Sequence, residues 1–203
     1  MTRPLNISDV HRCIFVHVPK AAGTSIKKAL DMPGGGHPTW MYFEKSFPKQ
    51  WREYRTFSVV RNPWERLVSA FSYAQMENSH WHDGDKAKHP DFDTLKGKTF
   101  SDCVRMLVDD RDLLKHESWH PQFPWLINHE NGQLVSKVDQ ILNCANLEQD
   151  FANLCALWNI DCAPLEKLNQ STHASYREYY DEQTKLLASQ LYKVDIQLFK
   201  FDF

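Results

Sequence analysis

The chain has 203 residues, a length that suits one domain or one domain with a small appendage. Its 42% hydrophobic and 25% charged residues exclude the fibrous and the disordered classes of protein. The net charge of −2 argues against capture of nucleic acid by bulk electrostatics, so any anion site must be a local cluster.

The N-terminal segment, MTRPLNISDVHRC, lacks the apolar core of a secretion signal, and no segment approaches the length that spans a bilayer. The five cysteines are therefore expected to be reduced thiols in a soluble, cytoplasmic protein, although Cys155 and Cys162 could pair. No CxxC pair indicates zinc, and His80 and His82 lie in a polar, turn-rich stretch typical of a solvated loop.

Short apolar strands alternate with helical segments along the chain. Buried strands are predicted at residues 14–18 (IFVHV), 56–60 (TFSVV) and 138–142 (VDQIL). Helices are predicted at residues 24–30, 63–75, 99–110 (with Thr99 or Ser101 as cap), 146–160 and 176–194. This alternation predicts an α/β layer with a mainly parallel sheet, in a single domain of residues 1–203.

The first strand and the first helix are joined by VPKAAGTS, a turn with the residue types of an anion site. Gly23 permits either a positive φ or a close backbone approach, and the amides of the helix N-terminus would face the anion. Thr24 and Ser25 add hydroxyl donors, and Lys20 adds a full charge. In a Walker A loop the lysine follows the second glycine, whereas here it precedes the glycine. The alternative is an ordinary strand–turn–helix connection with a solvated lysine.

The second strand leads into another strand–turn–helix, FSVVRNPWERLVSAF. Arg61 leaves the strand end, and Ser69 lies two turns into the following helix. Parallel strands present their carboxyl ends to one crevice, where the planar fork of Arg61 suits a phosphate. The alternative pairs Arg61 with Glu65 and leaves Ser69 a structural residue.

Together these stretches resemble the paired cofactor motifs of the sulfotransferases that use 3′-phosphoadenosine 5′-phosphosulfate (PAPS). The closest likeness is to soluble, bacterial-type members of the carbohydrate sulfotransferase branch. VDQILNCANLEQDF and LNQSTHASYREYYDEQ also resemble later segments of that family. The resemblance implies a three-layer fold like that of P-loop NTPases, with a central, mainly parallel sheet flanked by helices. It also implies that the 5′-phosphosulfate is held by Lys20, Ala22, Gly23, Thr24 and Ser25, and the 3′-phosphate by Arg61 and Ser69.

The function implied is transfer of a sulfuryl group from PAPS to a hydroxyl of a carbohydrate or related acceptor, by in-line displacement and without a metal. Residues 77–135 would form the acceptor-binding insertion. A base should take the hydroxyl proton, and histidine suits neutral pH. His37, in a context like G-x-H-x-x-W, is the first candidate, and His120, in SWHPQF, is the second. His116 and Glu65 follow, and His17 is expected to be a buried core histidine.

Two other functions stay open at this stage. A small nucleotide kinase or NTPase would need a Mg²⁺ carboxylate, for which Asp139 is the one candidate, and the place of Lys20 argues against it. A non-catalytic nucleotide-binding relative is the other alternative. Relatives commonly carry an arginine and a glutamate where this chain has Asn143 and Ala145, so a binding role for that strand is in doubt.

Overall fold

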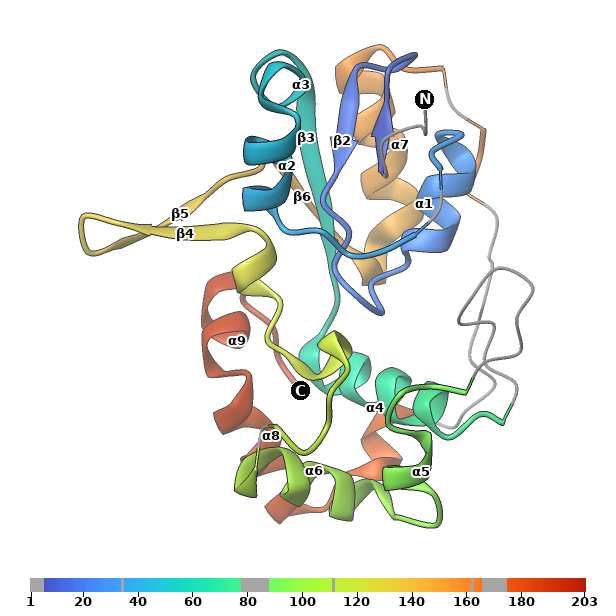
Figure 1. The fold of residues 1–203 in the computed structure, drawn as a ribbon, viewed down its shortest axis with the longest axis vertical. Helices are drawn as coiled ribbons and strands as arrows, with labels where there is room; N and C mark the ends of the chain where they lie inside the picture. Colours follow the sequence, from blue (N-terminus) through green and yellow to red (C-terminus); the bar gives the residue numbers. More distant parts are fainter. Residues whose placement is uncertain (1–5, 34, 78–87, 111, 162, 166–174) are drawn as a thin grey trace. The chain divides into compact units, whose positions relative to one another are not determined.

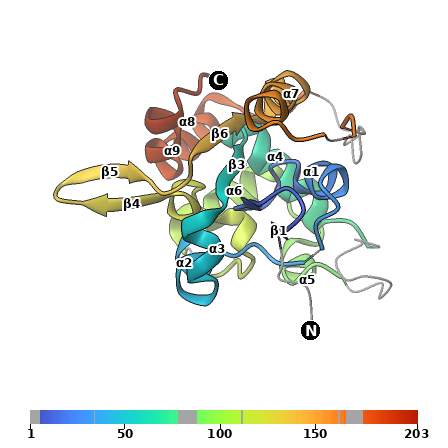
Figure 2. The same ribbon diagram turned by 90° about the horizontal axis from the view of Figure 1, so that it is seen from above.

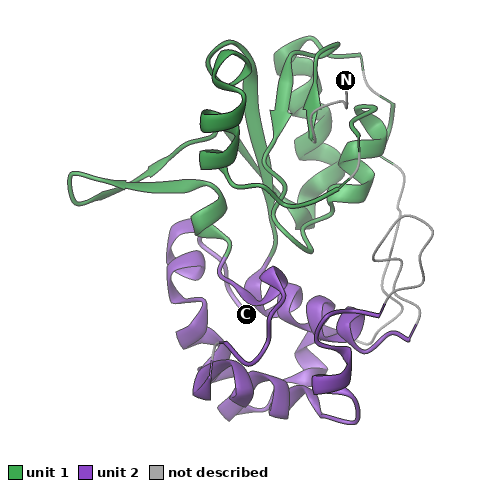
Figure 3. Cartoon of the chain, in the orientation of Figure 1, with its two compact units in different colours: residues 1–61, 122–170 green, residues 62–121, 171–203 purple. Residues whose placement is uncertain are grey.

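The computed structural model describes residues 6–33, 35–77, 88–110, 112–161, 163–165 and 175–203. The chain forms two compact units (Figure 3). Unit 1 consists of Met1–Arg61 and Gln122–Gln170, and unit 2 of Asn62–Pro121 and Ser171–Phe203. The chain therefore leaves unit 1 directly after Arg61 and first returns to it at Gln122. The prediction of a single domain, with an acceptor-binding insertion at residues 77–135, stays a prediction.

Unit 1 is built on a four-stranded, mainly parallel sheet with the strand order β1-β2-β3-β6 (Figure 1). Its strands are β1 (Ile7–Ser8), β2 (Cys13–Phe15), β3 (Arg55–Val60) and β6 (Gln140–Asn143). Strand β1 is antiparallel to β2, whereas β2, β3 and β6 run parallel to one another. The predicted α/β fold with a mainly parallel central sheet is thus confirmed.

Helices cover both faces of this sheet. On one side lie α1 (Gly23–Ala29) and α7 (Leu147–Trp158), and on the other lie α2 (Trp40–Ser46) and α3 (Pro48–Glu53) (Figures 1 and 2). A hairpin of β4 (Ile127–Glu130) and β5 (Gln133–Ser136) extends away from the sheet in both views, and short 3-10 turns form at η2 (Phe123–Trp125) and η3 (Cys144–Asn146).

The core of unit 1 fixes the register of the two central strands. Phe15 pairs with Phe57, and their buried rings stack with centroids 5.0 Å apart. The ring of Trp158, from α7, meets Phe57 edge-on at 5.6 Å. Beyond the end of β2, the Val16 amide still donates to the Phe57 carbonyl (2.9 Å). This register brings the loop after β2 and the residue after β3 to the same edge of the sheet.

Unit 2 is helical. It contains α4 (Pro63–Ala74), α5 (Phe92–Leu95), α6 (Phe100–Asp109), η1 (Glu117–Trp119), η4 (Tyr176–Tyr179), α8 (Glu182–Leu191) and α9 (Lys193–Phe199). Side chains cap three of its described α-helices, and the side chain of His116 caps η1. The side chain of Asn62 accepts from the amides of the first turn of α4, and Thr99 and Asp181 form capping boxes at α6 and α8. Buried apolar side chains of α4 and α6 face each other, with the rings of Phe71 and Phe100 5.5 Å apart.

Two predictions about the C-terminal part need correction. The helix expected at residues 176–194 is wrong, because the capping box of Asp181 starts a new helix and Tyr192 (φ −109°, ψ 22°) ends it. The expectation of five reduced thiols is also wrong for Cys155, which is disulfide-bonded, whereas Cys13, Cys103 and Cys144 are thiols. The remaining cysteine, Cys162, lies outside the described residues, as do His80, His82 and residues 168–174 of the last family-like segment.

Candidate active site

The loop between β2 and α1 has an unusual backbone for its residue types. Lys20 and Ala22 have φ angles of 64° and 55°, in the left-handed region that side chains with a Cβ disfavour. Each such residue costs on the order of 1–2 kcal/mol and persists where the surroundings hold the backbone in a particular shape. Ala22 is followed directly by helical Gly23, and such a left-handed–right-handed pair turns successive amides toward one point, a geometry that binds anions.

Gly23 is required for packing and not for its φ angle. It is the first residue of α1 and is absent from the positions with positive φ. A Cβ added to Gly23 would overlap the Nε2 end of the buried imidazole ring of His17. Of the two reasons that the sequence suggested for a glycine here, close approach is therefore the correct one, and the group approached is a side chain.

Lys20 and Arg61 bring two positive charges together at the ends of adjacent strands. Both side chains are half-buried, and Nη1 of Arg61 donates to the carbonyl of Lys20 over 3.3 Å. Burial, and then the charge of Arg61, lower the pKa of Lys20 to about 8. No side chain among the described residues caps α1, in contrast to α4, α6 and α8. This edge of the sheet thus carries two positive side chains, and the first amides of α1 have no side-chain cap among the described residues. Both features favour the binding of an anion.

Gln122 braces the backbone of Arg61, a role that the sequence did not reveal. Its side chain is fully buried, with Oε1 accepting from the Arg61 amide (2.9 Å) and Nε2 donating to the Arg61 carbonyl (2.8 Å). These two bonds replace the ladder bonds of a neighbouring strand just beyond β3. In the stretch SWHPQF the sequence pointed to His120 as a site residue. The structure shows instead that Gln122 of this stretch holds Arg61, the candidate for binding the 3′-phosphate.

His37, the first candidate for the base, lies against His17. The ring centroids of His17 and His37 are 4.4 Å apart, and the rings are inclined by 53°. The carbonyl of His37 accepts a hydrogen bond from the Trp125 indole (2.8 Å). The side chain of His37 is half-buried, and His17 is buried as predicted. Since His17 also packs on Gly23, the structure joins His37 to the loop through a residue expected to be only part of the core.

The other predicted site residues are placed less directly. In unit 1, Ser25 is buried and Thr24 is exposed, both in the first turn of α1. Ser69 and His120 belong to unit 2, where Ser69 is buried on α4 and His120 is exposed. The carbonyl of His120 accepts from the buried guanidinium of Arg66, another residue whose role the sequence did not reveal. The parts of Ser69 and His120 in the site stay predictions.

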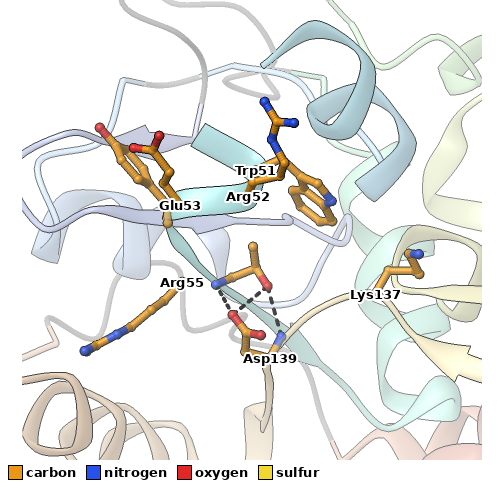
Figure 4. A pocket seen from close by; sticks show the side chains of 8 residues that line it. Trp51, Arg52, Glu53, Arg55, Lys137 and Asp139 are labelled. Carbon is orange, nitrogen blue, oxygen red and sulfur yellow. Dashed lines mark hydrogen bonds between the residues drawn. The ribbon is translucent and has the colours of Figure 1, made fainter. Parts of the chain in front are cut away.

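A cavity of about 330 Å³ lies at the opposite end of strand β3 from Arg61 (Figure 4). It is lined by Trp51, Arg52, Glu53, Tyr54, Arg55, Thr56, Lys137 and Asp139. The carboxylate of Asp139 accepts from the amide and hydroxyl of Thr56 (2.7 and 3.0 Å). Thr56 and Arg61 are five positions apart along extended chain, which corresponds to about 17 Å. Asp139 therefore cannot serve the loop of Lys20 as a Mg²⁺ ligand.

Comparison with known proteins identifies the family. The model of the sulfotransferase family matches residues 3–202, nearly the whole chain. No curated protein matches the chain. Among the described residues, no helix is both long and apolar enough to cross a membrane, and no group of three or more His, Cys, Asp or Glu side chains could hold a metal ion. Agreement between the family match, the parallel sheet and the cationic loop after its first parallel strand shows that the chain belongs to the sulfotransferase family.

Proposed function

We propose that the protein transfers a sulfuryl group from PAPS to a hydroxyl of a carbohydrate or a related acceptor. The observation that carries this proposal is the convergence of Lys20 and Arg61 at the carboxyl ends of β2 and β3. Two positive side chains that the fold places at one edge of the sheet create a local positive potential, which favours the binding of an anion there. A sulfotransferase needs such a site for its anionic donor.

The residues at this edge of the sheet fit the chemistry of PAPS. The donor has two separate anionic groups, a 5′-phosphosulfate and a 3′-phosphate. Lys20, with the amides after Ala22 and the Ser25 hydroxyl, would hold the first group. Arg61, braced by Gln122, would hold the second, with Ser69 as its predicted partner. When bound, PAPS supplies an activated sulfuryl group with a phosphate as its leaving group.

Two side chains would do the chemical work. Lys20 would stabilise the negative charge that develops on the departing phosphate, and with a pKa of about 8 its ammonium is still about 90% protonated at pH 7. His37 would accept the proton of the attacking hydroxyl, because imidazole can act as a base near neutral pH. His120 stays the second candidate for that role. Catalysis would otherwise consist of positioning, as in phosphoryl transfer.

The position of Asp139 weakens the alternative of a kinase or NTPase, because it removes the one carboxylate that the sequence offered for Mg²⁺. A non-catalytic relative would share the anion site and lack only turnover. A cytoplasmic location stays a prediction. That location was predicted from the expectation that all five cysteines are reduced. The disulfide-bonded Cys155 counts against that expectation, because disulfides persist mainly in oxidising compartments.

Thermal denaturation with adenosine 3′,5′-bisphosphate (PAP), the product of the donor, tests the donor site directly. PAP at one hundred times its Kd is expected to stabilise the protein by about 2.7 kcal/mol, with or without EDTA, and ATP with Mg²⁺ is expected to stabilise it less. Transfer of labelled sulfate from PAPS to a panel of glycans and small alcohols then separates an enzyme from a non-catalytic relative. Binding that requires Mg²⁺, or a preference for ATP, would refute the proposal.

A further inference from the structure

His17 is a buried histidine that the proposed chemistry does not use. It follows β2, and only 6% of its surface is exposed. Its ring stacks on Phe15, with centroids 5.2 Å apart, and Phe15 stacks in turn on Phe57. A third aromatic ring would fill such a position without burying polar atoms. The Nδ1 atom of His17 has no hydrogen-bond partner among the described residues, and a buried nitrogen left in that state lowers stability.

The contacts of His17 connect two segments of the candidate site. On one side its ring occupies the space that the missing Cβ of Gly23 leaves open, at the first residue of α1. On the other side it contacts the ring of His37 and hydrogen-bonds to the backbone of Gly36. The two segments are separated by twelve residues of chain, and the imidazole lies against both of them.

The charge state of His17 agrees with a supporting role. Burial, followed by the nearby charges of His37, Lys27 and Lys20, holds the pKa of His17 well below its ordinary value. The ring is therefore neutral at physiological pH and adds no positive charge that would compete with Lys20 for the donor. A neutral imidazole keeps one N–H donor, which suits a backbone carbonyl.

We propose that His17 is a positioning residue that holds the Gly36–His37 segment against the start of helix α1. This contact would fix His37 beside the donor loop, the loop between β2 and α1 that contains Lys20. The inference rests on the proposed function in treating His37 as the base. A residue in this place acts through His37 and touches neither donor nor acceptor. Its loss should loosen His37 and slow the chemical step while the donor still binds, because small misplacements of a catalytic group are costly.

The hydrogen bond from the Trp125 indole to the His37 carbonyl provides a reporter that does not depend on activity. In His17→Leu, which removes both the ring and the hydrogen bond, exchange of the Trp125 indole proton should be at least about tenfold faster than in the wild type. His17→Gln retains a nitrogen within reach of Gly36 and should give a smaller increase. Leu154→Ala, a buried change on helix α7 of the same unit, is the control and should leave this exchange unchanged. The indole signal is assigned with Trp125→Phe.

Kinetics complete the test. In His17→Leu, kcat should fall about tenfold or more, while KM for PAPS and Kd for PAP stay within about threefold of the wild type, and His17→Gln should recover part of kcat. Unchanged indole exchange in both His17 variants, or an equal rise in Leu154→Ala, would overturn the proposal. So would a loss of PAP affinity as large as the loss of kcat. If the wild type transfers no sulfate to any acceptor, the proposed function fails, and the exchange measurement still decides whether His17 positions His37.

Discussion

The affinity of the protein for PAP is expected to fall as the pH rises from 7.5 to 9.5. In the free protein, burial and the charge of Arg61 lower the pKa of Lys20 from 10.5 to about 8. A bound phosphate would favour the ammonium and return the pKa toward its ordinary value, so PAP binding takes up a proton between pH 8 and 10.5. The contribution of Lys20 is present below pH 8 and is lost as the pH rises above it. Proton linkage between these two pKa values gives a loss of affinity of about 20-fold between pH 7.5 and 9.5.

Isothermal titration calorimetry at constant ionic strength measures the affinity for PAP at each pH. Repeating it in buffers with different ionisation enthalpies gives the number of protons taken up on binding. At pH 9.25 the uptake should be about 0.9 proton per PAP. Lys20→Arg keeps its charge throughout, so its affinity for PAP should not change in this pH range. Lys28→Ala, at an exposed lysine of helix α1, which follows the loop of Lys20, should behave as the wild type. Arg61→Ala should move the fall in affinity to higher pH. A flat profile in the wild type, or an equal fall in Lys20→Arg, would refute the assignment of Lys20 to the anion site.

Further predictions concern single residues of the loop and its supports. Lys20→Ala should lower kcat by at least about a hundredfold and PAP affinity much less, and Lys20→Arg should restore activity only in part; near-normal kcat with lost affinity would make Lys20 a mere anchor. Arg61→Ala should weaken PAP binding by roughly 1.5–3 kcal/mol, and binding of adenosine 5′-phosphosulfate, which lacks the 3′-phosphate, by less; equal losses in calorimetry would make Arg61 structural. Gly23→Ala should lower the free energy of unfolding in urea by about 1–3 kcal/mol, because its Cβ overlaps the ring of His17. Adding His17→Ala to the same chain should recover part of that loss, and simple additivity of the two changes would contradict the contact between Gly23 and His17. Gln122→Leu should cost about 1–3 kcal/mol of stability and also weaken PAP binding; unchanged PAP affinity would show that the brace does not matter for Arg61.

The sequence predicted those elements whose signals are local. The strand at 56–60 and the helix at 63–75 match β3 and α4 within one residue, because an apolar run, a proline at the helix start and an asparagine cap follow one another. Thr99 was correctly one of two candidates for the cap of α6. The β4–β5 hairpin was missed although Asn131 and Gly132, both with positive φ, form a typical hairpin turn. The break before Asp181 was missed because the predicted helix continues through Asp181, although this residue is the N-cap that starts α8.

The supports of the candidate site could not be predicted in the same way. Gln122 meets Arg61 across sixty-one residues of chain, and His17 meets His37 only because the register of Phe15 with Phe57 fixes where the chain leaves β2. No spacing rule carries such information, since each contact depends on the assembled sheet. The residues proposed to bind the anion could be chosen from the sequence because loops at the ends of parallel strands concentrate ligand contacts and carry distinctive residue types.

The low pKa of Lys20 also makes its amine a nucleophile. At pH 7.5 about a quarter of the Lys20 side chains would carry the neutral amine, against about 0.1% for a lysine with a pKa of 10.5. An acylating reagent at low dose should therefore modify Lys20 ahead of the exposed lysines, and PAP should protect it, so that peptide mass mapping would footprint the donor loop before any acceptor is known. The same property makes Lys20 the natural anchor for a covalent inhibitor built on the shape of the donor.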